Sequence, residues 1–198
     1  MTRLRYPAVL LAAAALASLA SDALAVPVTV RAGEVRLDDL TGGTVDPFAG
    51  DAATTVVLFV RSDCPISNRY APEVRRIWEE LAPRGVAFWL VYVERDASAE
   101  ALRRSTTAFG YPFPALRDTE HELVERTGAT VTPEAAVFDA DGRMVYRGRI
   151  DDRWAGLGRP RPAPTRHDLA EAAAAAAAGE RLGPRTTRAI GCFIADLE

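Results

Sequence analysis

The sequence contains no lysine at all, and it has only two cysteines and two histidines among 198 residues. All 24 basic residues are therefore arginines, which we attribute to compositional bias, and 27 acidic residues give a formal net charge of −3. The arginines are scattered among the acids, so the chain lacks the one-sided basic surplus that nucleic-acid binding needs. We therefore expect no nucleic-acid partner.

The sequence also lacks an apolar run of the roughly 20 residues that a membrane-spanning helix needs. A shorter, alanine-rich stretch covers residues 6–20 and follows Arg3 and Arg5, and Ala-Leu-Ala stands at 23–25. A basic start, an apolar stretch and a small-x-small cleavage site are typical of a secretory signal peptide. A permanent membrane anchor is the alternative, but the shortness of the run favours cleavage before Val26.

Residues 1–25 are thus predicted to be a signal peptide, and residues 26–198 a single domain that is periplasmic or secreted, with no permanent membrane span. Apolar residues make up 48% of the chain, which is enough for a core and argues against wholesale disorder. In an exported chain, disulfides can form and persist.

The apolar pattern predicts an α/β domain with a mixed central sheet flanked by helices. Continuous apolar runs at 56–60 and 86–93 are typical of strands buried on both faces. Apolar residues at 74, 77, 78 and 81 follow helical spacing between those strands. Further along the chain we expect helices at 98–109 and 118–126, a β-hairpin from 135–138 and 144–147, and a C-terminal helix over 165–178 followed by a tail.

Two further segments have weaker patterns. Residues 28–31 and 34–37 alternate in polarity around Ala32-Gly33 and predict an N-terminal β-hairpin. Residues 156–164 are rich in proline, glycine and arginine, and we interpret them as an ordered loop. At Thr165 a variant of the capping box is expected to open the C-terminal helix.

Cys64 stands where the first buried strand turns into the first helix. Pro65 suits the first helical position, and the helix dipole stabilises a thiolate at the helix start. Arg61 favours the thiolate and Asp63 opposes it, so the net shift of the thiol pKa stays open. Because strand-to-helix turns often carry functional residues, we predict a reactive thiol rather than a buried structural cysteine.

Thr132-Pro133 directly precedes the predicted hairpin. A proline at the start of a core strand removes a hydrogen-bond donor, so it needs a special turn geometry there. A cis peptide bond is the obvious candidate.

Together, the apolar strand, the Cys-Pro at a helix start, the β-α-β order and the Thr-Pro before a hairpin resemble the thioredoxin superfamily. The similarity covers about residues 35–149 and is greatest to exported redoxins of the alkyl hydroperoxide reductase/thiol-specific antioxidant type. The Cys-Pro-x-Ser-Asn motif and the segments at 146–152, 159–165 and 189–192 resemble a bacterial redoxin subgroup. The domain core is then about 35–150, and 151–198 is a C-terminal extension.

This resemblance implies a thiol oxidoreductase without a cofactor, in which Cys64 is the nucleophile. Its partners would be protein thiols or disulfides, or a small oxidant, together with an exported reductant. In such folds the cis-proline loop lies against the reactive thiol, which places Thr132 and Pro133 beside Cys64. Together with Pro65 and Ser67, these two residues are the candidate substrate-binding set.

Three departures restrict what the resemblance implies. Ser67 stands where dithiol thioredoxins have their second cysteine, which leaves a monothiol motif. Arg61 replaces the threonine that peroxiredoxins carry three residues before their cysteine, so peroxidase activity has weak support. Leu58 replaces the buried acid of dithiol thioredoxins, so proton transfer would need another group such as Glu134, or water.

Cys192 is a candidate second catalytic cysteine. Two cysteines in an exported chain favour pairing, although Cys192 could equally be an isolated apolar residue or bond to another protein. We expect the C-terminal tail to dock, with Cys192 near the Cys64 cleft.

A second hypothesis is a copper-binding or copper-delivery protein. Exported copper-assembly proteins of the Sco kind share the fold and bind copper through two cysteines and a histidine. Cys64 and His121 would be the ligands here, with Cys192 as a third, because thiolate and imidazole suit copper. A redox-inert interaction domain is the third possibility.

Overall fold

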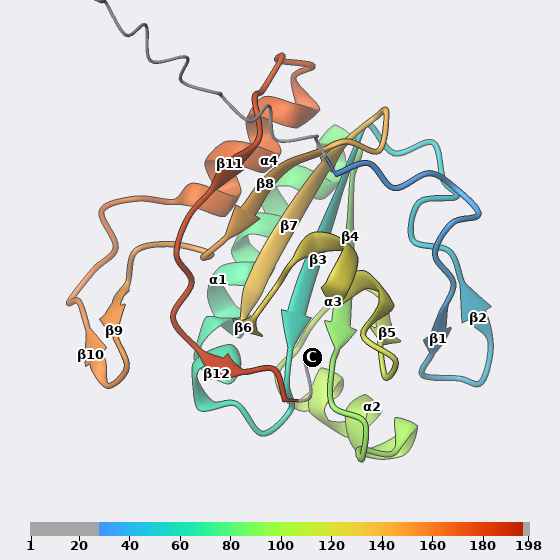
Figure 1. Cartoon of the computed structure of the whole chain (residues 1–198). Helices are drawn as coiled ribbons and strands as arrows, with labels where there is room; N and C mark the ends of the chain where they lie inside the picture. The colour runs from blue at the N-terminus through green and yellow to red at the C-terminus, as the bar shows by residue number, and fades with distance from the viewer. Residues whose placement is uncertain (1–27, 196–198) are drawn as a thin grey trace, which may run out of the picture.

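The computed structural model describes residues 28–195, and the predicted signal peptide lies outside them (Figure 1). Its largest sheet has eight strands in the order β11-β8-β7-β3-β4-β5-β1-β2, and two pairs, β10-β9 and β12-β6, lie apart from it. The strands are β1 (Leu37–Asp39), β2 (Thr44–Val45), β3 (Thr54–Val60), β4 (Val86–Tyr92), β5 (Ala115–Arg117), β6 (Val131–Thr132), β7 (Glu134–Asp139), β8 (Met144–Gly148), β9 (Trp154–Gly156), β10 (Arg159–Pro160), β11 (Arg185–Thr186) and β12 (Cys192–Phe193). The helices are α1 (Pro65–Leu81), α2 (Ala99–Ala108), α3 (Glu122–Thr127) and α4 (Asp168–Ala177), with a 3-10 turn at Ala82–Arg84.

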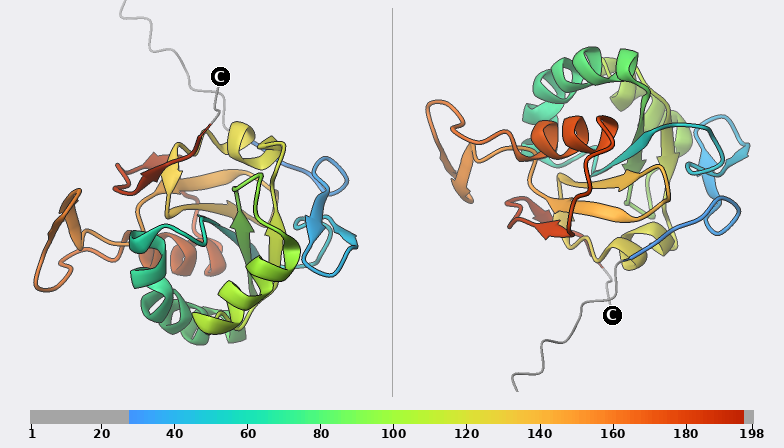
Figure 2. Two further views of the ribbon diagram at one scale, coloured as in Figure 1. Left: turned by 90° about the horizontal axis from the view of Figure 1, so that it is seen from below. Right: turned by 90° about the horizontal axis from the view of Figure 1, so that it is seen from above.

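This architecture confirms the predicted α/β class. Strand β3 is central, parallel to β4 and antiparallel to β7. Its side chains alternate between two cores: Val56 and Leu58 pack with α1 and α4, whereas Val57 and Phe59 face the side covered by α3. Figure 2 shows α1, α2 and α4 on one face of the sheet and α3 on the other. Both faces are covered, which explains why β3 reads as a continuous apolar run.

Helix α1 presents the predicted apolar stripe. Val74, Ile77 and Leu81 are buried, and Trp78 is half-buried against the same core. The helix ends in the 3-10 turn, after which Gly85 adopts a left-handed conformation with φ 82°. This stripe holds α1 on β3, and so fixes the start of α1 at the end of β3.

The predicted N-terminal hairpin exists, but its position was wrong. It is formed by β1 and β2, not by residues 28–31 and 34–37. The Asp39 carboxylate accepts hydrogen bonds from the amides of Thr41 and Gly43 and closes this turn. Residues 28–30 instead lie along the β7–β8 turn, where the Val30 amide donates to the Gly142 carbonyl.

The start of the C-terminal helix was also predicted wrongly. Helix α4 begins at Asp168, and the capping box at Thr165 does not form. The Thr165 amide and hydroxyl both donate to the Asp152 carboxylate, each at 2.6 Å, so Thr165 is already engaged.

The predicted short helix near 118–126 is α3. It begins at Glu122 after His121, which has a positive φ of 59°. Asp118 still caps it, because its carboxylate accepts from the amides of Leu123 and Val124 at 2.9 Å.

The C-terminal extension consists of an arm, helix α4 and a tail. The predicted ordered loop at 156–164 contributes to a small hairpin, β9–β10, which projects from the body of the molecule (Figure 1). The tail after α4 adds β11 to the edge of β8 and then crosses to pair β12 with β6. Within residues 28–195, the helices are too short or too polar to cross a membrane.

Candidate functional site

Cys64 lies at the junction of β3 and α1, as predicted. It is the N-cap residue of α1, with extended backbone angles (φ −83°, ψ 112°), and Pro65 is the first helical residue. The Asn68 amide donates to the Cys64 carbonyl at 3.0 Å, and the Asn68 side chain donates to the Ser62 carbonyl at 3.1 Å. The turn is thus fixed on both sides of the thiol, whose residue is only 1% exposed.

The Thr132-Pro133 peptide bond is cis, which confirms the prediction. The loop lies against Cys64, whose thiol donates to the Thr132 carbonyl at 3.2 Å. Thr132 is fully buried. The structure thus brings together the thiol and the loop that the resemblance placed beside it.

The C-terminal tail completes the site. Strand β12 runs antiparallel to β6, with Cys192 opposite Thr132, and the Ile194 amide donates to the Thr130 carbonyl at 3.0 Å. The Sγ atoms of Cys64 and Cys192 are 2.6 Å apart, and both residues are free thiols. The docked tail that we expected from the sequence is present, and it places Cys192 against Cys64.

The pKa values of the two thiols are shifted in opposite directions. Burial alone would raise the pKa of Cys64, but hydrogen bonds from Cys192 and from Ser67 outweigh it and lower that pKa below its ordinary value. Burial raises the pKa of Cys192, and its hydrogen bond to Cys64 raises it further. Cys64 is therefore the thiol that ionises first, and Cys192 keeps its proton.

Ser67 occupies the position of the missing second cysteine. It is buried, and both its backbone and its hydroxyl contribute hydrogen bonds toward the Cys64 sulfur. Because Ser67 lowers the pKa of Cys64, it contributes to stabilising a thiolate instead of supplying a second thiol.

Arg61 and Asp63, which were expected to shift the pKa of Cys64 in opposite directions, form an ion pair with each other. Two nitrogens of the Arg61 guanidinium each lie 2.9 Å from a carboxylate oxygen of Asp63. Their charges therefore largely cancel beside Cys64.

Glu134, which the sequence suggested as a proton-transfer group, has its carboxylate engaged by two other groups. Its carboxylate accepts from the Thr130 amide at 3.0 Å and pairs with Arg147 at 3.2 Å. Both oxygens are thus used to hold the segment that leads into the cis-proline loop. Glu134 is a structural residue of the site.

Sequence reasoning missed Glu94. It follows β4, is 8% exposed, and accepts from the Ser62 amide at 2.7 Å. Its other oxygen is buried without a hydrogen-bond partner in the described part of the chain. An acid immediately after the apolar run at 86–93 was the available signal.

His121, the ligand of the copper hypothesis, is buried and bonds through Nε2 to the Val93 carbonyl at 2.9 Å. In residues 28–195, the ligand atoms of His121 and the two cysteines do not come within 4.8 Å of one another as a group. Nothing in this arrangement favours copper over thiol chemistry.

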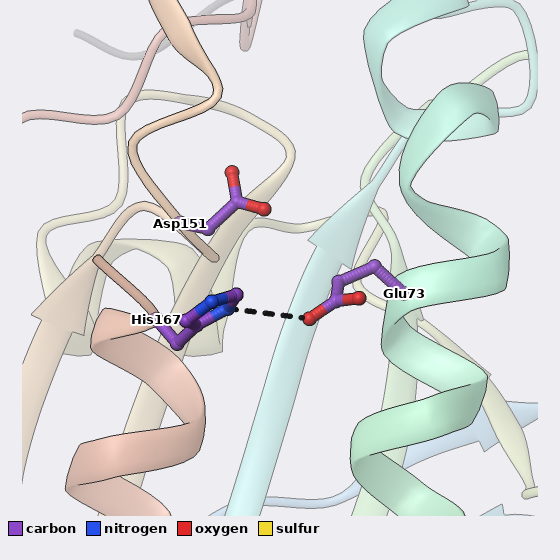
Figure 3. A group of neighbouring side chains, drawn as sticks. All are labelled: Glu73, Asp151 and His167. Atoms are coloured by element: carbon purple, nitrogen blue, oxygen red, sulfur yellow. Dashed lines mark ion pairs between the residues drawn. The ribbon is translucent and has the colours of Figure 1, made fainter. Parts of the chain in front are cut away.

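A different group of potential metal ligands lies between α1 and α4: Glu73, Asp151 and His167 (Figure 3). The Glu73 carboxylate is 2.8 Å from Arg76 and 3.7 Å from His167. Asp151 accepts from the Tyr70 hydroxyl at 2.5 Å and lies 3.7 Å from the Arg153 guanidinium. Because each of the two carboxylates is paired with an arginine, we interpret this group as an ion-pair network that links α1 to the start of α4.

Comparison with known proteins is consistent with this site. A model of the Redoxin family matches residues 27–158. The chain belongs to the Redoxin family. The matched residues include Cys64 and the Thr132-Pro133 loop, whereas Cys192 lies beyond them, so the second thiol of this redoxin comes from its C-terminal extension.

Solved structures support the fold of this redoxin. A hypothetical protein from Sinorhizobium meliloti 1021 is 25% identical with a TM-score of 0.71, over 85% of this chain and 94% of that one. An uncharacterized conserved protein from Geobacillus kaustophilus is 27% identical with a TM-score of 0.69, over 85% and 91%. A secreted disulfide oxidoreductase from Mycobacterium tuberculosis, homologous to DsbE of E. coli, is 18% identical with a TM-score of 0.51, over 73% and 95%, and is alike in fold. No curated protein matches.

Proposed function

We propose that this redoxin is an exported thiol–disulfide oxidoreductase whose working pair is Cys64 and Cys192. The observation that carries the proposal is the 2.6 Å separation of the two sulfur atoms. Cysteines can be bridged only when their backbones already lie close together. In support of this, Cys192 pairs with Thr132, whose carbonyl oxygen is 3.2 Å from the Cys64 sulfur.

In this proposal Cys64 is the nucleophile, because the thiolate is the reactive form and Cys64 is the more acidic thiol of the pair. Pro65 and Ser67 form the helix start around it, and Thr132 and Pro133 form the opposite wall. When the pair becomes a disulfide, two electrons and two protons pass to a partner disulfide or a small oxidant. The reverse reaction takes them from a partner with two thiols.

Export is part of the proposal and rests on the basic, apolar and Ala-Leu-Ala pattern of residues 1–25. An oxidising compartment suits a pair that must form a disulfide, whereas cytosolic thiols are kept reduced.

Counting free thiols tests the proposal. The protein is equilibrated in glutathione buffers of increasing oxidised fraction and quenched with acid. It is then unfolded in guanidinium and labelled with N-ethylmaleimide near neutral pH, and its mass is measured by mass spectrometry. We expect a change from two labels to none in one two-electron step, whereas Cys64→Ser and Cys192→Ser each keep one labelled or glutathione-bound cysteine. Two labels at every potential would refute the proposal.

A further inference from the structure

We propose that a partner thiol exchanges with the Cys64–Cys192 disulfide at Cys192 on the tail, and that Cys64 is the sulfur released. This inference rests on the proposed function, because it needs that disulfide. Cys64 keeps its role as the nucleophile that forms the disulfide, because its thiolate attacks the mixed disulfide held on Cys192, whereas the partner itself bonds to Cys192.

The first argument is access. Cys64 is 1% exposed, beneath the Thr132 carbonyl and the Cys192 thiol. Cys192 is partly exposed and is followed by Phe193, whose side chain is largely in solvent (77% exposed). An incoming thiolate must reach the sulfur that it attacks, and Cys192 is the residue of the pair that has exposed surface.

The second argument is the leaving group. In thiol–disulfide exchange the thiol of lower pKa leaves faster. The pKa of Cys64 is lowered and that of Cys192 is raised, so attack on Cys192 expels the better leaving group. Attack on Cys64 would expel a thiolate whose pKa burial and the Cys64 contact both raise.

The exchange balances in two steps. A partner thiolate bonds to the Cys192 sulfur, the Cys64–Cys192 bond breaks, and its electron pair stays on Cys64 as a thiolate. A second thiolate of the partner then attacks the partner sulfur of this mixed disulfide and releases Cys192, which takes a proton from water. The partner dithiol is oxidised by two electrons, and the protein disulfide is reduced.

This geometry also selects the partner class. While the tail is docked, the Cys64 thiolate stays next to Cys192 and can reverse the first step. A partner with one thiol therefore stays on Cys192 only briefly, long enough for a rapid acid quench to trap it, before Cys64 expels it. A partner with two thiols completes the reaction. We infer that the substrate or reductant is a dithiol, such as a protein with two neighbouring cysteines.

Gly191 provides a way to move the tail without touching either cysteine. A Cβ atom at Gly191 would overlap the Thr132 carbonyl oxygen, which is backbone and cannot give way easily. Gly191→Ala should therefore lift β12 from β6 and uncover Cys64. A Cβ atom at Gly183 would meet nothing within 4 Å, so Gly183→Ala is the matched control on the same segment.

The experiment uses the full-length oxidised protein, first shown by thiol counting to contain the intramolecular disulfide. It is mixed with reduced glutathione, quenched with acid within milliseconds to seconds, alkylated at low pH and digested with trypsin. Cleavage after the arginines separates the two cysteines into peptides 62–69 and 189–198. We expect at least ten times more glutathione on peptide 189–198 than on peptide 62–69.

The variants sharpen this test. Gly191→Ala should transfer a substantial part of the glutathione to peptide 62–69, and Gly183→Ala should leave the wild-type distribution unchanged. Glutathione mainly on peptide 62–69 of the wild-type protein would overturn this inference and leave the proposed function intact. Failure to form the intramolecular disulfide, detected before glutathione is added, would overturn the proposed function instead.

Discussion

The two cysteines occupy very different settings. Cys64 lies between β3 and α1, where every β3 residue is buried and the helix stripe packs on the same core. Cys192 lies on a two-residue strand near the end of the chain, held by pairing with β6 and by the burial of Ile194. One thiol is therefore built into the scaffold, and the other is attached to it by a small number of local contacts.

This difference separates stability from reactivity. Contacts around Cys64 contribute to the stability of the whole domain, whereas contacts around Cys192 govern whether the tail covers Cys64. Local openings of this kind can occur far below the free energy of global unfolding. The predictions below test that separation.

The largest effect on stability is expected from the disulfide bond between Cys64 and Cys192. The cysteines are 128 positions apart in the chain, and a loop of that order corresponds to about 4–5 kcal/mol in the chain-entropy model of disulfide stabilisation. Oxidised protein should therefore have a free energy of unfolding higher by about that amount than reduced protein, measured by guanidinium denaturation. Cys192→Ser should show no difference between the two conditions, and equal stability of both wild-type forms would contradict the prediction.

In the reduced protein we expect a smaller effect, in which a change in the tail alters the alkylation rate of Cys64 more than it alters global stability. Ile194 is 5% exposed and belongs to the core on the α3 side. Ile194→Ala should free the tail. Because a short end can detach locally, the free energy of global unfolding should fall by only about 1 kcal/mol or less, whereas alkylation of Cys64 should become faster by roughly tenfold. Iodoacetamide labelling followed by mass spectrometry of peptide 62–69 measures that rate.

The matched scaffold variant is Ile77→Ala, which empties a buried site on α1 that is 1% exposed. It should lower the free energy of unfolding by about 2–5 kcal/mol and leave the labelling rate of Cys64 in native conditions nearly unchanged. If both variants change stability and labelling in the same proportion, the two regions are not separable.

The smallest effect is a dependence of the unfolding free energy on pH that arises from the two free thiols and therefore belongs to the reduced protein. The pKa of Cys64 is lowered by folding, so its contribution to stability grows as pH rises from that lowered value to about 8.5, the ordinary value of an unfolded thiol. The pKa of Cys192 is raised by folding, so its contribution is present below about 8.5 and declines above it.

The difference in unfolding free energy between reduced and oxidised protein should therefore pass through an optimum near pH 8.5. A tenfold change in the acidity of a thiol on folding corresponds to about 1.4 kcal/mol of stability. Denaturation curves of both forms from pH 6 to 10 measure the effect, and a monotonic fall over that range would contradict the lowered pKa of Cys64.

Most of the scaffold could be predicted from the sequence, because its signals are local. The apolar runs of β3 and β4, the stripe on α1 and the cis Thr132-Pro133 bond each depend on neighbouring residues. Cys64 at the helix start follows from the same local pattern, and the structure confirms it.

The errors and omissions arise where a distant residue decides the outcome. Thr165 is a good capping residue, but Asp152 engages it from the other end of the arm. Glu134 was a candidate proton-transfer group until Arg147 and the Thr130 amide were found on its carboxylate. That Cys192 reaches Cys64 was predicted only as a possibility, since the course of a tail depends on which sheet edge it finds.

The Asp152 carboxylate joins the two ends of the projecting arm. It accepts from the amides of Thr165 and Arg166 and from the Thr165 hydroxyl, so both ends of the arm are held together at its base. Beyond this base, Trp154 attaches the arm to the core that lies between the sheet and α1. A Cβ atom at Gly158, between β9 and β10, would meet nothing within 4 Å, so this end of the arm is where we expect an inserted peptide to disturb the base of the arm least.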